Sequence, residues 1–331
     1  MHVSNLALNV SLAIAIAVVA VALMTLGDVG LSPAAWGEAF LHWKSVPAEI
    51  VWGIRLPRNL AAVGVGAMLG MSGALMQGLL RNPLAEPGLL GVSAGAGLGA
   101  SMAIFAGVGL VPFVIEGSAM AGAAIAGLLL VIFVQRFPQR QSLILFGVGL
   151  SAFCGALSSL AFNLAKSPIA MSDVMSWLMG AVENRSWYDV LWCVIGLLLA
   201  AALTWRLGRG LRFLTLGEET ARSMGIDMTR LTQVVVIGSS LLAGLSVAVA
   251  GIIGFVGLAA PHFVRAMGVK DPFRLILPSA LTGGLMVLLA DGFIRVIPAT
   301  GELHLGVLTS LIGAPLFAVL AYRSARSWMQ D

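Results

Sequence analysis

Charged residues are scarce in this chain. Asp, Glu, Lys and Arg make up 10% of its 331 residues, whereas soluble domains contain about 25%. The hydrophobic fraction is 59% and the mean hydropathy is +0.98. These values exclude a soluble globular protein, and no polar stretch is long enough to form a separate soluble domain. We therefore expect a single membrane domain over residues 1–331, so that any ATPase or receptor must be another chain.

Cysteine and histidine are scarce as well. Both cysteines, Cys154 and Cys193, lie inside apolar runs, so we expect small packing side chains and no disulfide. Lys and Arg occur singly near the ends of apolar runs, so the net charge of +4 does not indicate nucleic-acid binding. The histidines lack the spacing of metal ligands, so we expect no bound metal. They are His2, His42, His262 and His304.

Long apolar runs are abundant instead. Runs of about 20 apolar residues, enough to cross a bilayer as a helix, recur along the whole length. We therefore expect an all-α polytopic membrane protein with about ten transmembrane helices. Placing both termini in the cytoplasm leaves most of the 19 Lys and Arg residues on that side, as the positive-inside rule favours. In this topology Arg55, Arg58 and Arg295 lie on the outer side, which the rule disfavours.

One polar stretch interrupts the apolar runs in the second half of the chain. Residues 211–225, the polar island, lie between two long apolar blocks. Thr215 and Glu218 have the spacing of a capping box, and Glu218 and Arg222 form an i,i+4 pair. The pattern predicts a helix with a specified start.

The polar island also carries signals for the end of its helix. Gly225 is placed to stop a helix in the left-handed conformation, and Asp227 can cap the helix that follows. The predicted topology puts this helix in the cytoplasm. Because the sequence specifies both ends of this helix, we favour a docking surface for a soluble partner. The alternative is a solvated loop between membrane helices.

Two proline-containing breaks lie within the apolar blocks. Asn82, Pro83 and Pro87 interrupt the chain between the second and third expected spans, and a glycine-rich bend at 251–260 precedes Pro261 and a short eighth helix. Similar Gly-Leu-Leu and Gly-Ile-Ile sequences come before the two prolines, which indicates a weak internal repeat. With an odd number of spans between them, the repeats would be inverted, as in many transporters.

Four motifs occur in order along the chain, and together they resemble one family. They are Arg-Leu-Pro-Arg at 55–58, Ser-Gly-Ala-Leu-Met-Gln at 72–77, Asn-Pro-Leu-Ala-Glu-Pro-Gly-Leu-Leu-Gly at 82–91 and Leu-Gly-Glu at 216–218. Over its whole length the chain resembles the permease subunit of bacterial type II ABC importers for cobalamin, haem and ferric siderophores. The resemblance implies the type II ABC importer permease fold and import of a bulky metal chelate from periplasm to cytoplasm.

The resemblance also implies partners and a location. In that family two permease copies form the pathway in the bacterial inner membrane, two cytoplasmic ATPase subunits bind ATP and Mg²⁺ and drive it, and a periplasmic binding protein delivers the ligand. This chain would be a multi-pass subunit in the lipid bilayer, with no cofactor and no enzymatic activity of its own. Family breadth favours a ferric siderophore or haem over cobalamin, and neither His262 nor His304 is expected to ligate haem.

Three sets of residues take their roles from the resemblance. Contact with the ATPase, through coupling helices at about 211–228, is assigned to Leu216, Gly217, Glu218, Ala221, Arg222 and Gly225. A cytoplasmic gate is assigned to Asn82, Leu84, Gln141 and Ser142, although Gln141 departs from the small hydroxyl pair that is common in the family. Docking of the binding protein is assigned to Arg55, Arg58 and Arg295.

Each assignment has a plainer alternative. Pro83 and Pro87 can simply end helices, and the arginines can snorkel to the membrane interface. For the function as a whole the rival is an ion-coupled secondary transporter, which would also have broken helices and inverted repeats. Such a transporter would need an ionisable residue in mid-membrane, and the best candidate, Asp291, lies close to the end of a span.

Overall fold

The structure is a computed structural model, which describes residues 5–27, 29–109, 111, 113–137, 139–165, 167–205, 207–297 and 303–328. Within these ranges every regular element is a helix, so the expected all-α class is confirmed. In chain order the elements are α1 (Asn5–Met24), α2 (Pro33–Leu41), α3 (Val46–Ala48), the π-helix η1 (Glu49–Arg55), α4 (Leu56–Leu80), the 3₁₀ helix η2 (Pro87–Leu90), α5 (Val92–Phe105), α6 (Val114–Arg136), α7 (Arg140–Leu164), α8 (Pro168–Leu178), α9 (Trp187–Trp205), α10 (Gly208–Leu214), α11 (Glu218–Ser223), α12 (Met228–Ala250), α13 (Val256–Ala266), α14 (Pro272–Val296) and α15 (Leu305–Trp328).

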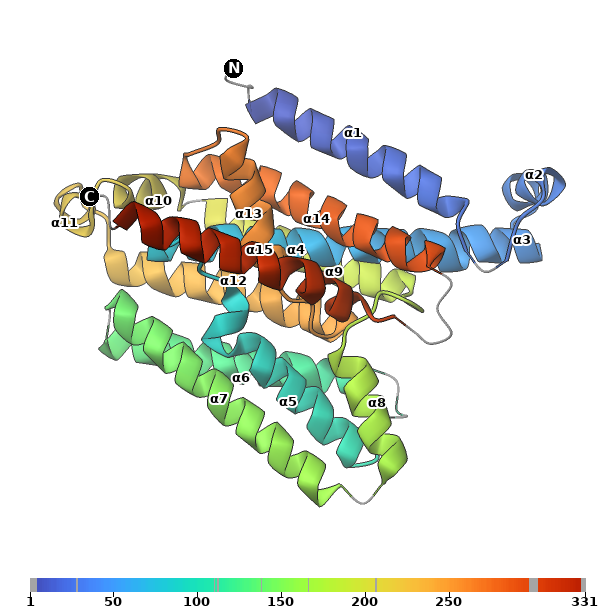
Figure 1. The fold of residues 1–331 in the computed structure, drawn as a ribbon, viewed down its shortest axis with the longest axis horizontal. Coiled ribbons are helices and arrows are strands. Elements are labelled where there is room, and N and C mark those ends of the chain that lie inside the picture. The colour runs from blue at the N-terminus through green and yellow to red at the C-terminus, as the bar shows by residue number, and fades with distance from the viewer. Residues whose placement is uncertain are drawn as a thin grey trace.

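The long helices run roughly along the long axis of the molecule (Figure 1). Seven of the described helices are long and apolar enough to cross a membrane, and two shorter apolar stretches are Val92–Phe105 and Leu305–Val319. The short helix that the sequence predicts after the second break is α13, with 11 residues. A polytopic helical membrane protein is thus confirmed, while the number of ten spans stays a prediction.

The order of helices repeats in the two halves of the chain. α1, α4, α5, α6 and α7 are followed, after α8, by α9, α12, α13, α14 and α15, and a break precedes both α5 and α13. α4 runs toward the end of the bundle that carries α11, and α12 runs away from it (Figure 1). The helix order therefore supports the inverted repeat that the sequence indicates.

α4 lies inside the bundle, and its glycines set how closely the neighbouring helices approach. Most of its 25 residues are buried. A Cβ atom at Gly70 would lie 2.1 Å from the carbonyl oxygen of Ser279 in α14, and one at Gly73 would lie 1.7 Å from that of Gly257 in α13. Glycine permits such contact between helix backbones because it has no side chain. Two helices from the second half of the chain thus hold α4.

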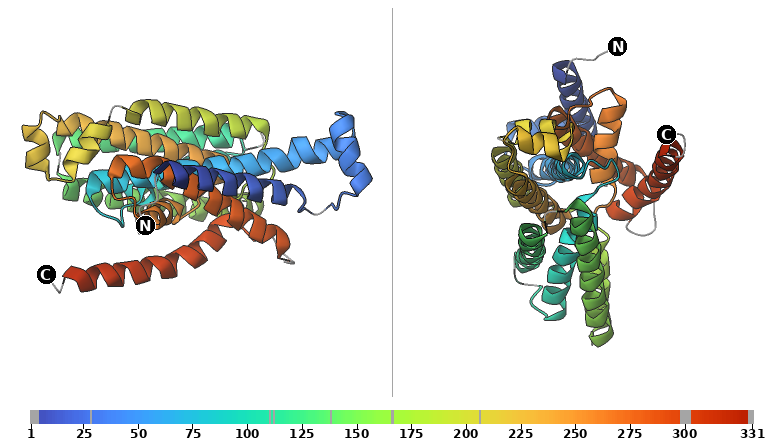
Figure 2. Two further views of the ribbon diagram at one scale, coloured as in Figure 1. Left: turned by 90° about the horizontal axis from the view of Figure 1, so that it is seen from above. Right: turned by 90° about the vertical axis from the view of Figure 1, so that its left-hand side faces the viewer.

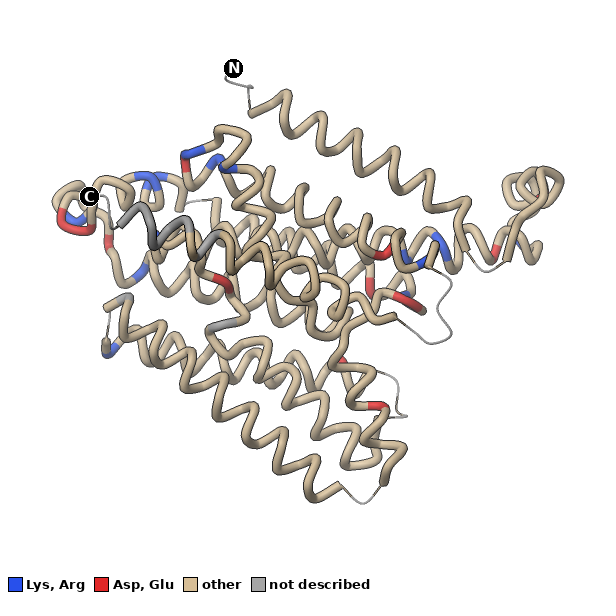
Figure 3. Tube along the Cα trace, in the orientation of Figure 1, with Lys and Arg blue, Asp and Glu red and all other residues tan. Residues whose placement is uncertain are grey.

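The two ends of the bundle differ. At one end, called the α11 end, α10 and α11 form a cap, and many of the Lys and Arg residues gather there (Figure 3). At the other, called the α2 end, α2 and α3 extend beyond the other helices (Figure 2). α15 diverges from the bundle as it runs toward the C-terminus, on the side of the α11 end (Figure 2). This charge distribution is the one that the positive-inside rule predicts if the α11 end is cytoplasmic.

Replacing Gly73 with alanine should destabilise the bundle, because the new Cβ would collide with the backbone of α13. Overpacking of this kind costs about 1–3 kcal/mol, so the Gly73→Ala protein should unfold at a lower temperature in detergent. Gly149→Ala is the matched control, since Gly149 lies in α7 with nothing within 4 Å of an added Cβ. Equal melting temperatures for the two variants would contradict this packing.

Candidate functional site

The polar island folds as two short helices, α10 and α11, joined by a turn. The predicted pair within α11 is confirmed, since Arg222 Nη2 lies 2.8 Å from Glu218 Oε1. The predicted capping box is wrong. Thr215 Oγ1 donates a 2.6 Å hydrogen bond back to the carbonyl of Arg212, and the N-cap of α11 is Gly217, with φ 114°. The chain reverses at Gly217, so the hydroxyl of Thr215 caps the end of α10 instead.

The predicted end of the island is confirmed. Gly225 has φ +80°, in the left-handed region, and no heavy atom lies within 4 Å of a Cβ built on it. Asp227 caps α12 through a 3.0 Å hydrogen bond that its Oδ1 accepts from the N–H of Arg230. The island is therefore an ordered pair of helices and not a slack loop.

The island is fixed to the membrane bundle through α10. Leu211 and Leu214 are fully buried. Arg212 Nε lies 2.7 Å from Asp271 Oδ2, just before α14, and the Arg212 guanidinium lies over the Phe273 ring at 5.5 Å. A displacement of α10 would therefore act directly on the start of α14.

Two apolar side chains of the island face outward. Leu216 is 63% exposed and Met224 is 54% exposed, one on each side of α11 in the sequence. Ala221 is fully buried, so in this structure it packs α11 onto the bundle and does not offer a contact to a partner. Met224 was not assigned from the sequence, although an apolar side chain directly before a helix-ending glycine was an available signal.

The break after α4 lies against the island. Arg81 adopts the left-handed conformation, with φ 50°, and its Nη2 donates a 3.4 Å hydrogen bond to the carbonyl of Thr215. Asn82 Oδ1 accepts a 2.9 Å hydrogen bond from the N–H of Leu84, which forms a turn in place of a helix. The end of α4 is thus bonded to the island through Arg81, and the first gate residues follow directly in the chain.

Two further contacts concern the gate. Glu86 Oε1 accepts a 3.0 Å hydrogen bond from the N–H of Phe255, so the break after α4 is bonded to the break before α13. Gln141 and Ser142 lie in the first turn of α7, where the Ser142 hydroxyl lies 3.4 Å from Gln139 Oε1. α7 begins near the α11 end (Figure 1). The gate residues therefore lie toward one end of the bundle, and their gating role stays a prediction.

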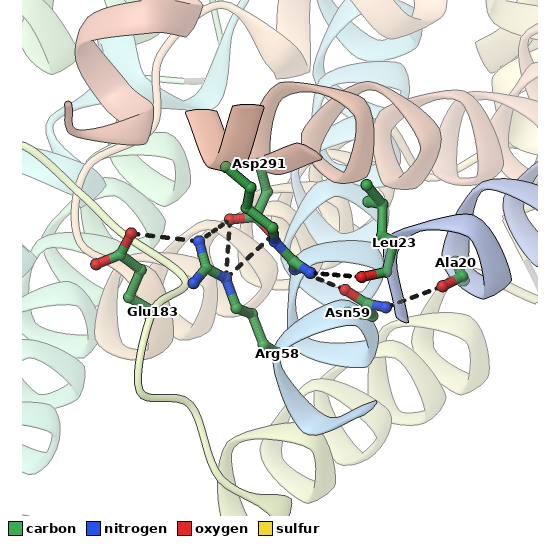
Figure 4. A network of polar contacts seen from close by, with 7 residues as sticks. Ala20, Leu23, Arg58, Asn59, Glu183 and Asp291 are labelled. Atoms are coloured by element: carbon green, nitrogen blue, oxygen red, sulfur yellow. Dashed lines mark hydrogen bonds and ion pairs between the residues drawn. The ribbon is translucent and has the colours of Figure 1, made fainter. Parts of the chain in front are cut away.

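At the opposite end of α4, Asp291 is the centre of a cluster of polar contacts (Figure 4). Its side chain is only 2% exposed. Oδ1 lies 2.7 Å from Arg58 Nη2, and Oδ2 accepts hydrogen bonds from the guanidinium of Arg295 one turn along α14. A buried carboxylate is compensated here by two cations, one from α4 and one from α14.

The same cluster caps the C-terminal end of α1. The last carbonyls of a helix lack partners within the helix and form its negative end. Asn59 Nδ2 donates to the carbonyl of Ala20 at 3.0 Å, and Arg295 Nη1 donates to that of Leu23 at 3.1 Å. Arg55 Nη1 donates to the carbonyl of Met24 at 2.6 Å. Side chains of α4, η1 and α14 thus supply the cap that α1 lacks.

This geometry narrows the docking hypothesis for the three arginines. Arg55 is 5% exposed, and the side chain of Arg295 is 4% exposed. Both are bonded within the chain, so neither offers a docking surface in this structure. The Arg58 side chain is 19% exposed and pairs with Glu183, itself 40% exposed, at 3.2 Å. Of the three, Arg58 is the one that a partner could reach.

The comparisons with known proteins agree with the helical membrane fold. The FecCD transport family matches residues 13–323. The chain is similar to the vitamin B12 import system permease protein BtuC of Salmonella typhi and to that of Salmonella newport (strain SL254). Identity is 42% over 287 residues in both, covering 86% of this chain and 87% of each relative.

Solved structures are similar as well. One, described as an inward-facing conformation of a metal-chelate type ABC transporter, has a TM-score of 0.85 and 32% identity, over 95% of this chain and 98% of that chain. PsaBC from Streptococcus pneumoniae in complex with Fab has a TM-score of 0.57 and 18% identity, over 80% of this chain and 90% of that chain. The second likeness shows the fold alone.

Neutralising Asp291 should destabilise the protein far more than neutralising Glu183. Asp291→Asn removes the carboxylate that pairs with the buried Arg295 and leaves Arg58 only the partly exposed Glu183. Breaking a buried pair costs about 3–5 kcal/mol. Glu183→Gln removes a partly exposed pair, which contributes about 0–1 kcal/mol. Thermal unfolding in lipid nanodiscs measures both, and similar melting temperatures would mean that the cluster does not hold α1, α4 and α14 together.

Proposed function

Because the chain belongs to the FecCD transport family, we propose that it forms the pathway of an ATP-driven importer that carries a bulky metal chelate from periplasm to cytoplasm. The chain is a permease subunit of an ABC importer of the metal-chelate or vitamin B12 type. One observation supports the proposal beyond family membership. The break after the central helix α4 is bonded to the capped polar island through Arg81 and Thr215.

Cobalamin is the first candidate cargo. The relatives with 42% identity are named for vitamin B12 import. Haem and ferric siderophores, which family breadth favours, are the second candidates. All three are bulky metal chelates, so the same general pathway can serve any of them.

The proposed assembly has two copies of this chain in the bacterial inner membrane, with both termini in the cytoplasm. Two ATPase subunits, which bind ATP and Mg²⁺, dock at the α11 end, and a periplasmic binding protein docks at the α2 end. The gathering of Lys and Arg at the α11 end supports this orientation (Figure 3).

The island suits the coupling role mechanically. Leu216 and Met224 offer apolar contacts to an ATPase, while the Glu218–Arg222 pair and the conformation of Gly225 keep α11 ordered. A rigid helix transmits displacement, whereas a frayed segment would absorb it. A displacement of α11 by the ATPase would reach α14 through α10. It would reach the break after α4 through the hydrogen bond between Arg81 and Thr215.

Asn82 and Leu84 are proposed to close the inner end of the pathway, together with Gln141 and Ser142 of α7. The turn at Asn82 and the prolines around it keep this segment out of a regular helix. A segment without a continuous ladder of helix hydrogen bonds can shift at modest cost when its neighbours move.

Arg58 is proposed to dock the binding protein by exchanging partners. Glu183 is partly exposed and holds Arg58 from the outer side, whereas Asp291 holds it from within. An acidic residue of the binding protein can replace Glu183 without leaving Arg58 unpaired. Charge reversal by Arg58→Glu should then weaken docking at low salt at least tenfold, and undiminished docking would refute this role.

Reconstituted transport tests the function. In proteoliposomes that contain this chain, its ATPase and its binding protein, uptake of labelled cobalamin should require ATP and Mg²⁺ and be indifferent to ion gradients. Ferric siderophore and haem, each with a binding protein that carries it, are assayed in parallel to define the cargo. Uptake driven by a proton or sodium gradient without ATP would instead identify a secondary transporter.

A further inference from the structure

The helix α13 begins at a residue that cannot cap it. Its N-cap is Phe255, which makes no side-chain cap hydrogen bond and adopts the left-handed conformation with φ 66°. That conformation is uncommon for a residue other than glycine. The first N–H groups of a helix lack partners within the helix and form its positive end. α13 therefore needs a partner from elsewhere in the chain, since lipid cannot supply one.

Glu86, in the break after α4, supplies that partner. Glu86 is itself the N-cap residue of η2, yet its side chain makes no cap hydrogen bond there. Its Oε1 instead accepts a 3.0 Å hydrogen bond from the N–H of Phe255. A Cβ atom at Gly257 would lie 3.7 Å from Glu86 Cγ, so the side chain lies against the first turn of α13. A carboxylate is favourable at this positive end, and Glu86 thus caps α13 from another part of the chain.

A second set of contacts joins α13 to α4 itself. Arg265, in the last turn of α13, donates from Nη2 to Gln77 Oε1, and Gln77 Nε2 donates to the carbonyl of Leu258 at 3.4 Å. Gln77 is buried near the end of α4. α13 has only 11 residues, so these contacts and the bond to Glu86 hold both of its ends. We therefore expect α13 to move as one body with the end of α4 and the break.

The side chain of Phe255 continues this connection to α15. A Cβ atom at Gly313 of α15 would lie 2.2 Å from the Cβ atom of Phe255, so the two segments are in close contact. The Phe255 ring also meets the ring of Phe317, with centroids 6.5 Å apart and an interplanar angle of 60°. Phe255 thus bonds the break after α4 through its N–H and contacts α15 through its side chain.

We propose that Glu86 is a positioning residue for transport, which makes α13 and α15 follow the movement of the break after α4. The inference rests on the proposed function and extends its coupling path from the inner gate into the second half of the chain. A displacement that reaches the break through Arg81 moves Glu86, and Glu86 moves the start of α13 and, through Phe255, α15. Without the carboxylate the break can move while α15 stays in place.

Spin labels at two positions test this connection. In the assembled importer in nanodiscs, with Cys154 and Cys193 replaced by alanine, both copies carry a label either at position 84 or at position 319, where Val319 of α15 is 49% exposed. With Glu86 present, both label distances should differ between the nucleotide-free and the ATP-trapped states. In Glu86→Ala the difference at 84 should persist, and the difference at 319 should fall at least threefold. Glu86→Gln, which keeps an acceptor oxygen, should preserve both differences.

Three outcomes of this experiment would overturn the proposal. One is a distance at 319 that does not depend on nucleotide in the unsubstituted importer. Another is a difference at 319 that is equally large in Glu86→Ala. The third is the loss of both differences in Glu86→Ala, which would mean that Glu86 only maintains the fold of the break.

Two phenylalanines provide a matched pair of variants that leave Glu86 intact. Phe113, the N-cap of α6, also adopts the left-handed conformation, with φ 64°, but its ring meets Tyr188 and not α15. Glycine at either position suits the left-handed backbone and removes the ring. Phe255→Gly should lower the difference at 319 at least threefold, and Phe113→Gly should preserve it. Equal differences in the two variants would contradict the connection through Phe255.

Transport separates a positioning role from a structural one. In proteoliposomes, the number of ATP molecules hydrolysed per cobalamin delivered should rise at least tenfold in Glu86→Ala and stay within threefold in Glu86→Gln. Ser32→Ala, which removes the 3.2 Å cap of α2 at the opposite end of the molecule, is the control and should leave this ratio unchanged. If the unsubstituted protein shows no ATP-dependent uptake of any chelate, the proposed function fails. If uptake is ATP-driven and Glu86→Ala couples it equally well, the positioning role of Glu86 alone fails.

Discussion

Every break in a membrane helix has to satisfy its backbone polar groups within the protein, because lipid offers them no hydrogen-bond partner. The break after α4 meets this constraint through side chains and through close packing. Asn82 caps the N–H of Leu84, and Glu86 accepts from Phe255 across the bundle. The approach of α13 to Gly73 brings the second break within reach of the first. The close packing at the glycines of α4 therefore lets the two breaks bond to each other. These irregular segments are the ones that can move.

The arginines at the α2 end show how a membrane protein can keep cations on the side that the positive-inside rule disfavours. Arg55 and Arg295 bond carbonyl groups in the last turn of α1, where the helix end is negative. Asp291 compensates Arg58 and Arg295. Asp291 thus has a structural partnership near the end of α14, which weakens it as an ion-coupling residue in mid-membrane. The same contacts leave Arg58 as the arginine with access to a partner.

The sequence predicted much of this architecture, because apolar length and proline position act locally. The short α13 after the second break, the Glu218–Arg222 pair and the cap at Asp227 agree with it. Predictions were less accurate where a distant contact decides the outcome. Thr215 fits a capping box by spacing, yet the turn at Gly217 directs it to α10. The burial of Ala221, and the capping of α1 by Arg295, which is 272 positions from Leu23, depend on tertiary packing that no local pattern encodes.

The central claim is that movement of the polar island passes to the break after α4 and opens or closes the inner end of the pathway. The most direct test places a spin label at position 84 in both copies of the assembled importer, with Cys154 and Cys193 replaced by alanine, and measures the distance between the labels. The account predicts that the distance differs between the nucleotide-free and the ATP-trapped states. It also predicts that this difference is lost when Leu216 and Met224 are both replaced by serine, while the matched change Met267→Ser preserves it. Identical distances in the two nucleotide states of the otherwise unsubstituted importer would contradict the account.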